Sequence, residues 1–111
     1  MNRGPWPMVE ITFVTESGEL TLNAVEDTSV MWNAVQNSVP GIIGECGGEL
    51  SCATCHVYLD PAAISRLPAP TLAETEMLEV LEAYTECSRL CCQIRVNEAL
   101  KEMRFQVAPQ E

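Results

Sequence analysis

The stretch Glu45-Cys46-Gly47-Gly48-Glu49-Leu50-Ser51-Cys52-Ala53-Thr54-Cys55 decides how the rest of this chain is organised. It places three thiols at gaps of five and two residues, with paired glycines and two hydroxyl side chains between them. Neither a regular helix nor a strand aims three side chains so spaced at one point, so the stretch predicts a loop wrapped around a ligand. Thiolates select soft metals, which limits that ligand to zinc, copper(I) or an iron–sulfur cluster.

Cysteine spacing separates the iron–sulfur interpretation from its alternatives. Structural zinc sites bring their cysteines in two short pairs, two to four residues apart, whereas here the first gap is five and no second short pair follows. A disulfide framework suits small secreted domains, and residues 1–8 lack the apolar segment of a signal peptide. An iron–sulfur centre takes three cysteines from one loop and a fourth from far away, here Cys87, Cys91 or Cys92.

Composition bounds the kind of protein. The chain has 111 residues, 47% of them hydrophobic, as expected for one globular domain. We expect this domain to cover residues 8–108, after a loose Pro-rich segment at 1–7. Six Lys or Arg against sixteen Asp or Glu give a formal net charge of −10, which disfavours nucleic acid and anionic membranes as partners. The acidic excess serves solubility or steers a basic protein partner.

The order of predicted elements indicates an α+β fold. In chain order we expect strands over 9–14 and 19–25, a helix over 30–37, a strand over 56–59, a helix from 71 to about 83, and strands over 93–97 and 103–107. Gly18 suits a hairpin turn, Asp27 or Thr28 caps the first helix, and Thr71 with Glu74 forms a capping box on the second. A hairpin followed by a helix and a crossing loop opens a ubiquitin-like β-grasp, in which a mixed sheet packs on a helix.

The cysteine pattern also resembles a known family. Cys46-x5-Cys52-x2-Cys55, with thirty-six residues before Cys92 in Ser88-Arg89-Leu90-Cys91-Cys92-Gln93-Ile94, is similar to the 2Fe-2S ferredoxins of the adrenodoxin and putidaredoxin type. Val39-Pro40-Gly41-Ile42 and Met77-Leu78-Glu79 extend the resemblance over most of the chain. It implies that Cys46, Cys52, Cys55 and Cys92 hold one 2Fe-2S cluster. Because Cys91 and Cys92 are neighbours, we expect an extended segment to point their side chains to opposite faces, so that only one reaches the iron. With Cys92 as the ligand, Cys91 is a small buried hydrophobic residue and Cys87 a free thiol.

A cluster loop must also offset charge. A four-thiolate 2Fe-2S centre carries about two negative charges when oxidised and three when reduced, and inward backbone N–H groups stabilise such an anion. Glycines let the backbone approach the sulfurs, while hydroxyl side chains either donate to sulfur or serve local turns. A Rieske-type centre needs two histidines and this chain has one, so we expect its ring to be hydrogen bonded in the core. The residues expected to support the loop are Gly44, Gly47, Gly48, Ser51, Thr54 and His56.

The predicted helix from Thr71 has an acidic side. Met77, Leu81 and Tyr84 recur at gaps of four and three, which predicts an inward apolar stripe. The carboxylates opposite have no Lys or Arg at helical spacing, which destabilises a helix slightly and suggests use in binding. In adrenodoxin-type ferredoxins the corresponding stretch contacts basic surfaces of reductase and acceptor. The resemblance therefore implies partner-binding roles for Glu74, Glu76 and Glu79. Helical spacing of three and four puts Glu79, Glu82 and Glu86 on one outer face, so we expect Glu82 and Glu86 to take part as well.

The sequence shows no catalytic triad, paired catalytic carboxylates, phosphate loop or flavin fingerprint, which favours an electron carrier over an enzyme. The resemblance implies one-electron transfer from an NAD(P)H-dependent flavoprotein ferredoxin reductase to a haem-thiolate (cytochrome P-450) monooxygenase. A ferredoxin for iron–sulfur cluster assembly is the alternative within electron transfer, and a cluster-bearing sensor or zinc module is the alternative outside it. We expect a monomer in the bacterial cytoplasm, or the mitochondrial matrix for a processed form.

Overall fold

The computed structural model describes residues 8–42 and 55–109. Predictions for residues 1–7 and for Gly44, Cys46, Gly47, Gly48, Ser51, Cys52 and Thr54 lie outside these ranges. Within them the elements are β1 (Met8–Thr15), β2 (Gly18–Val25), α1 (Val30–Gln36), β3 (His56–Tyr58), α2 (Pro61–Ile64), α3 (Leu72–Glu79), β4 (Ser88–Leu90), the 3-10 helices η1 (Cys91–Gln93) and η2 (Glu98–Leu100), and β5 (Arg104–Val107).

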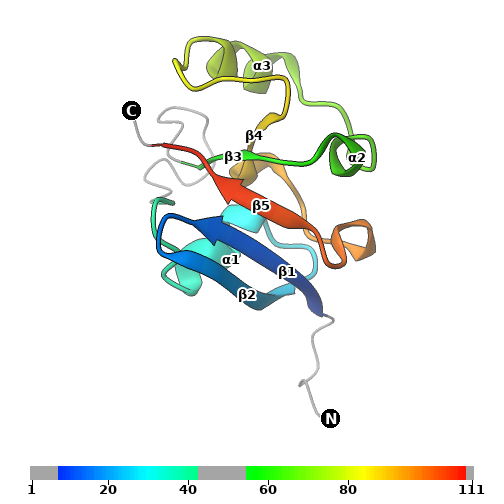
Figure 1. Ribbon diagram of the computed structural model, residues 1–111. Coiled ribbons are helices and arrows are strands. Elements are labelled where there is room, and N and C mark those ends of the chain that lie inside the picture. Colours follow the sequence, from blue (N-terminus) through cyan, green and yellow to red (C-terminus); the bar gives the residue numbers. More distant parts are fainter. Residues whose placement is uncertain (1–7, 43–54, 110–111) are drawn as a thin grey trace.

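The strands of the described chain form one five-stranded sheet in the order β2-β1-β5-β3-β4 (Figure 1). β1 pairs antiparallel with β2 and parallel with β5, while β3 pairs antiparallel with both β5 and β4. The predicted mixed sheet of a β-grasp is therefore confirmed. Figure 1 shows α3 beyond the β4 edge, at the opposite end of the sheet from β2. No helix among the described residues is long and apolar enough to cross a membrane.

The opening hairpin forms as the sequence predicts. Its eight residue pairs run from Met8↔Val25 to Thr15↔Gly18. Gly18 adopts a φ of 122°, a left-handed conformation that favours glycine, and the Thr15 hydroxyl donates to its carbonyl at 2.9 Å. The turn chemistry and the apolar alternation therefore fix the same register.

Helix α1 begins at Val30, as predicted, but neither predicted residue is its N-cap. The Ser29 hydroxyl accepts from the Trp32 N–H at 2.9 Å, so Ser29 is the N-cap. Thr28 is already occupied, because its hydroxyl donates to the Val25 carbonyl and accepts from the Asn33 amide. Asp27 has a φ of 68°, which is incompatible with the extended conformation of an N-cap. The expectation that Asp27 or Thr28 caps this helix was wrong.

The core lies between α1 and the sheet. Phe13 of β1 and Phe105 of β5 are fully buried, with ring centroids 5.6 Å apart. Val30 and Ala34 of α1 are buried in the same cluster. The central strand pair is thus covered by the helix, as an amphipathic helix on a half-buried sheet requires.

The predicted strand over 93–97 does not form. Residues 91–93 make the 3-10 helix η1, and the segment after it bonds to the chain before α1 through Val30 N–H to Ile94 O and Val96 N–H to Thr28 O, both at 2.8 Å. Besides β5, the strand that pairs with β3 is β4, which was not predicted. Three residues are too few for a period-two pattern to be recognised.

Helix α3 is shorter than predicted. It ends at Glu79, and the N–H groups of Leu81 and Tyr84 turn back to Leu78 and Leu81 carbonyls in tight single turns. The Tyr58 hydroxyl donates to the Ala83 carbonyl at 2.6 Å, which holds the following segment as a loop. The helical periodicity expected to reach residue 83 is therefore lost to a tertiary contact.

Candidate metal centre

Two of the expected ligand cysteines lie in the described chain, and the sheet brings them together. Cys55 immediately precedes β3, and Cys92 follows β4 in η1. Antiparallel pairing sets His56 opposite Leu90, and the Cys91 N–H donates to the Cys55 carbonyl at 2.9 Å. Residues more than thirty positions apart in the sequence therefore meet at one end of the β3–β4 pair.

The thiols at this end lie in contact. Hydrogen bonding with the Cys91 thiol raises the pKa of the Cys55 thiol to about 12, burial adds to the rise, and the Cys92 thiol opposes it. Cys55 is thus within hydrogen-bonding reach of both neighbours and is buried. A metal must displace such protons, because ligand cysteines bind as thiolates. A shielded set of sulfur donors of this kind fits an iron–sulfur cluster.

Cys91 and Cys92 differ in burial but do not lie on an extended segment. The expectation that extended backbone points their side chains to opposite faces was wrong, because both belong to the one-turn helix η1. Cys91 is fully buried, whereas Cys92 is half-buried and its sulfur accepts from the Gln93 side-chain amide at 3.4 Å. Cys87 is half-buried, one residue before β4. Burial of Cys91 agrees with the predicted packing role, and Cys92 as the fourth ligand stays a prediction.

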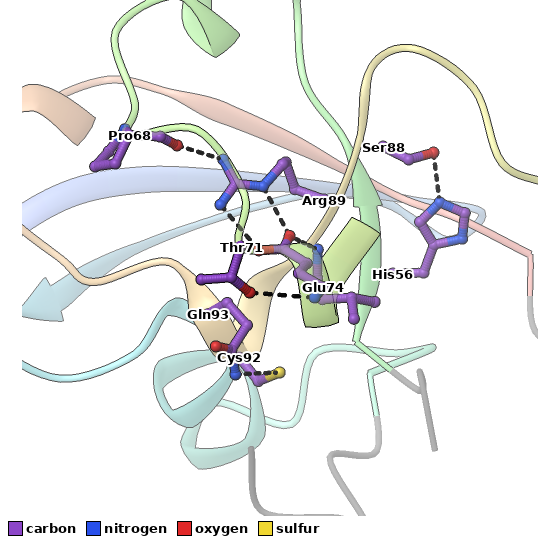
Figure 2. Close-up of polar contacts among 9 residues, drawn as sticks. His56, Pro68, Thr71, Glu74, Ser88, Arg89, Cys92 and Gln93 are labelled. Atoms are coloured by element: carbon purple, nitrogen blue, oxygen red, sulfur yellow. Dashed lines mark hydrogen bonds and ion pairs between the residues drawn. The ribbon is translucent and has the colours of Figure 1, made fainter. Parts of the chain in front are cut away.

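His56 lies in the core, as predicted. Its ring is buried, and its Nε2 atom lies 2.7 Å from the Ser88 hydroxyl on β4 (Figure 2). The ring also packs edge-on against Tyr58, with centroids 5.0 Å apart. The histidine therefore fastens β3, which begins right after Cys55, to β4, which leads to Cys92.

A buried ion pair beside the cysteine segment was missed by the sequence analysis. The Glu74 carboxylate on α3 accepts from Arg89 Nε at 2.7 Å, Arg89 Nη2 at 3.1 Å and the Leu90 N–H at 2.9 Å (Figure 2). Arg89 Nη1 donates to the Pro68 carbonyl at 3.1 Å. The pair ties α3 to β4 directly before η1, where Cys92 lies. A charged residue inside the short run Ser88-Arg89-Leu90-Cys91 was the available signal.

This ion pair corrects the expected partner surface. Glu74 is 1% exposed, so its carboxylate is not available to a partner. Thr71 does cap the helix, since its hydroxyl accepts from the Glu74 N–H at 3.2 Å. Glu76 and Glu79 are exposed on α3, as expected. Glu82 and Glu86 are exposed too, but they lie beyond the helix end and do not share its face.

The predicted inward stripe of α3 was also wrong in detail. Leu78 is the buried apolar residue of the helix, at 2% exposure, while Met77 and Leu81 are only half-buried. Tyr84 is 41% exposed and lies outside the helix. The shorter helix shifts the packing centre to Leu78 and Glu74.

Residues 8–42 and 55–109 by themselves hold no group of three or more ligating side chains that could bind a metal ion. Cys46 and Cys52 lie outside these ranges. What the described chain contributes is the pair Cys55 and Cys92, two sulfur donors at the same end of the β3–β4 pair. This donor chemistry fits the two remaining positions of a four-thiolate cluster.

Removing iron and sulfide is expected to lower the melting temperature by roughly 15 °C or more. With Cys55 and Cys92 as the predicted ligands, a bound cluster would crosslink two segments more than thirty residues apart, and closing a loop of that size stabilises a fold by about 3–4 kcal/mol. Circular dichroism melting before and after acid extraction measures the shift, with cluster reconstitution as the control. Coincident melting curves would contradict the expectation.

Comparison with known proteins identifies a family and several similar structures. The family of 2Fe-2S iron-sulfur cluster binding domains matches residues 14–97. Putidaredoxin of Pseudomonas putida is 42% identical over 95 residues, which cover 84% of this chain and 89% of that protein. The crystal structure of a reduced putidaredoxin variant from Pseudomonas putida superposes with a TM-score of 0.85 at 37% identity, over 91% of this chain and 97% of that one.

A complex is also among the similar structures. In the crystal structure of the covalent putidaredoxin reductase–putidaredoxin complex, the matching chain has a TM-score of 0.85 and 36% identity, over 91% of this chain and 99% of that one. Sequence and structure together show that this chain belongs to the 2Fe-2S ferredoxins of the adrenodoxin and putidaredoxin type, as an electron carrier that holds one 2Fe-2S cluster and is not an enzyme.

Proposed function

We propose that this ferredoxin carries single electrons from an NAD(P)H-dependent flavoprotein reductase to a haem-thiolate monooxygenase, as a cytoplasmic monomer. The observation that carries the proposal is the outer face of α3, where Glu76 and Glu79 are exposed. Among the described residues neither carboxylate belongs to an ion pair. Unpaired acidic groups steer a basic partner, and steering suits a carrier that must bind and leave quickly.

The position of α3 supports this role. Its inner side packs on β4 through Leu78 and through the Glu74 carboxylate, which accepts from the Leu90 N–H. β4 leads within two residues to Cys92. A partner bound to α3 therefore sits next to the segment that carries a proposed ligand. The bound cluster supplies one-electron redox chemistry, and Cys46, Cys52, Cys55 and Cys92 are proposed to hold it.

The similar proteins also favour this partner. Putidaredoxin has been captured with its reductase, and this chain matches putidaredoxin in that complex over nearly its whole length. The direct test is reconstitution with purified reductases and monooxygenases of the same genome. We expect anaerobic bleaching of the cluster by NADH or NADPH through one reductase, followed by substrate turnover with a monooxygenase. If the cluster is reduced but no monooxygenase turns over its substrate, the proposal that a monooxygenase is the electron acceptor is refuted.

Reversing one charge on α3 is expected to weaken reductase coupling. Glu76→Lys and Glu79→Lys should each raise the Michaelis constant for the ferredoxin about 5-fold, because each replaces an attraction by a repulsion at an exposed site. The visible spectrum should stay unchanged. Raising salt to about 0.5 M should weaken the wild-type protein as well, since the screening length falls to a few Å.

Glu10→Lys is the matched control. Glu10 is exposed on β1, in the hairpin at the far end of the sheet from α3. It makes the same change in net charge without touching the α3 face. Equal effects of all three substitutions would show that net charge, and not a docking face, controls the reaction.

A further inference from the structure

The outer face of α3 is not purely acidic. Leu72 and Val80 are each 74% exposed, whereas the other exposed large hydrophobic side chains of the described chain range from 37% to 45%. Single exposed apolar side chains are common on soluble proteins. Two that exceed the rest by this margin, at the two ends of one helix, call for a physical reason.

Helical geometry puts these residues on one face with the carboxylates. At about 100° per residue, Leu72, Glu76, Glu79 and Val80 fall within a sector about 100° wide. Glu74 and Leu78, which are buried, fall on the opposite side. With a rise of about 1.5 Å per residue, Leu72 and Val80 stand about 12 Å apart, with the two carboxylates between them. The face is therefore an acidic centre with an apolar side chain at each end.

We infer that Leu72 and Val80 are apolar anchors that hold the flavoprotein reductase after its charges have been steered into place. The inference rests on the proposed function and adds the chemistry of the partner surface. That surface carries Lys or Arg opposite Glu76 and Glu79, and aliphatic recesses about 12 Å apart that receive the two anchors.

The affinity of a complex is the reason to look for apolar anchors beside the charges. Exposed ion pairs contribute little to affinity, because solvent screens them and both side chains lose freedom. They raise the association rate more than they slow dissociation. Interfaces obtain their lasting affinity from a desolvated apolar core within a polar rim. On this face only Leu72, Val80 and the small Ala73 offer apolar surface among the exposed residues of α3 and its C-cap.

The reductase is the occupant favoured by the comparisons, because a close relative of this chain forms a complex with its reductase. Charge agrees, since the protein carries a net charge of −10 and this face contributes two unpaired carboxylates. The helix is also held rigidly, through the Glu74–Arg89 pair and Leu78. A rigid face loses little freedom on docking.

The test uses the intact holoprotein and the reductase that reduces the wild type fastest. Leu72→Gln and Val80→Gln each replace an apolar side chain by a neutral polar one that a helix tolerates, and so remove apolar contact without changing net charge. Each should raise Kd about 5-fold and the double variant about 20-fold, with the slope of log Kd against log salt unchanged. Glu76→Gln and Glu79→Gln should instead flatten that slope. Visible spectra and melting temperatures should match the wild type throughout.

Val35→Gln is the matched control, since Val35 is an exposed apolar residue on the other long helix, α1, and is 40% exposed. It should change Kd less than 2-fold. Equal Kd values for the Leu72, Val80 and Val35 variants overturn the inference. So does sedimentation showing that Leu72→Gln dissolves a dimer, because the face would then bind a second copy of this chain. Reduction of the wild type is measured first. If no reductase reduces it, the proposed function itself is refuted.

Discussion

Serine in place of Cys46, Cys52, Cys55 or Cys92 is expected to empty the protein of iron or to change its visible spectrum strongly. The hydroxyl of serine is a poor substitute for a thiolate, which iron–sulfur clusters require. Cys87→Ser and Cys91→Ser should keep about two irons and two sulfides per chain. Iron and sulfide analysis with visible and electron paramagnetic resonance spectra measures all six variants.

The decisive comparison is between Cys91 and Cys92. Both lie in η1, the Cys91 N–H donates to the Cys55 carbonyl, and both thiols influence the pKa of the Cys55 thiol. Cys91→Ser should lower stability modestly, because it puts a hydroxyl into a fully buried site. Loss of the cluster in Cys91→Ser together with its retention in Cys92→Ser would show that the assignment is reversed.

Arg89→Leu is expected to lower the free energy of unfolding by about 3–5 kcal/mol. The substitution leaves the Glu74 carboxylate buried beside β4, and within residues 8–42 and 55–109 its one remaining donor is the Leu90 N–H. An uncompensated buried charge is strongly destabilising. Urea denaturation of the holoprotein, followed by absorbance and circular dichroism, gives the value.

The double variant Glu74→Leu/Arg89→Leu separates charge from packing. Without either charge, only the Leu90 N–H and the Pro68 carbonyl lose a partner, so the double variant should be more stable than Arg89→Leu alone. Glu74→Gln keeps an acceptor for Leu90 and should be milder than Arg89→Leu. If Arg89→Leu lowers the free energy of unfolding by less than about 1 kcal/mol, the Glu74–Arg89 pair does not hold α3 against β4.

Local signals explain what the sequence predicts well. The hairpin and the Thr71 cap follow from residues within a few positions of one another. The four expected ligands were recognised because family spacing is a feature of the chain itself. By contrast, the loop after α3 is held at Ala83 by Tyr58, twenty-five residues away, and the conformation of residues 93–97 depends on bonds to residues 28–30. No periodicity within those segments records such contacts.

The same distinction holds within the candidate site. The sequence assigns Glu74 to a capping box, and this local role gives no reason to look for a second one. Its bond to Arg89, fifteen residues further on, was therefore not predicted. Choosing among Cys87, Cys91 and Cys92 required the resemblance, because reasoning from an extended segment assumed a backbone that the structure replaces with η1. His56 was easier, since a single histidine beside a ligand has few roles apart from hydrogen bonding in the core.

The parallel pairing of β1 with β5 has a consequence for biosynthesis. Thr12 lies beside Arg104, so the middle of the sheet cannot close until the last strand has left the ribosome. The sixty-one residues that follow Cys46, up to Val107, take roughly 3–12 s to translate at about 5–20 residues per second. During that time the cysteines emerge on a nascent chain whose sheet is still open. The central pairing of the sheet is therefore among the last to form as the chain is made.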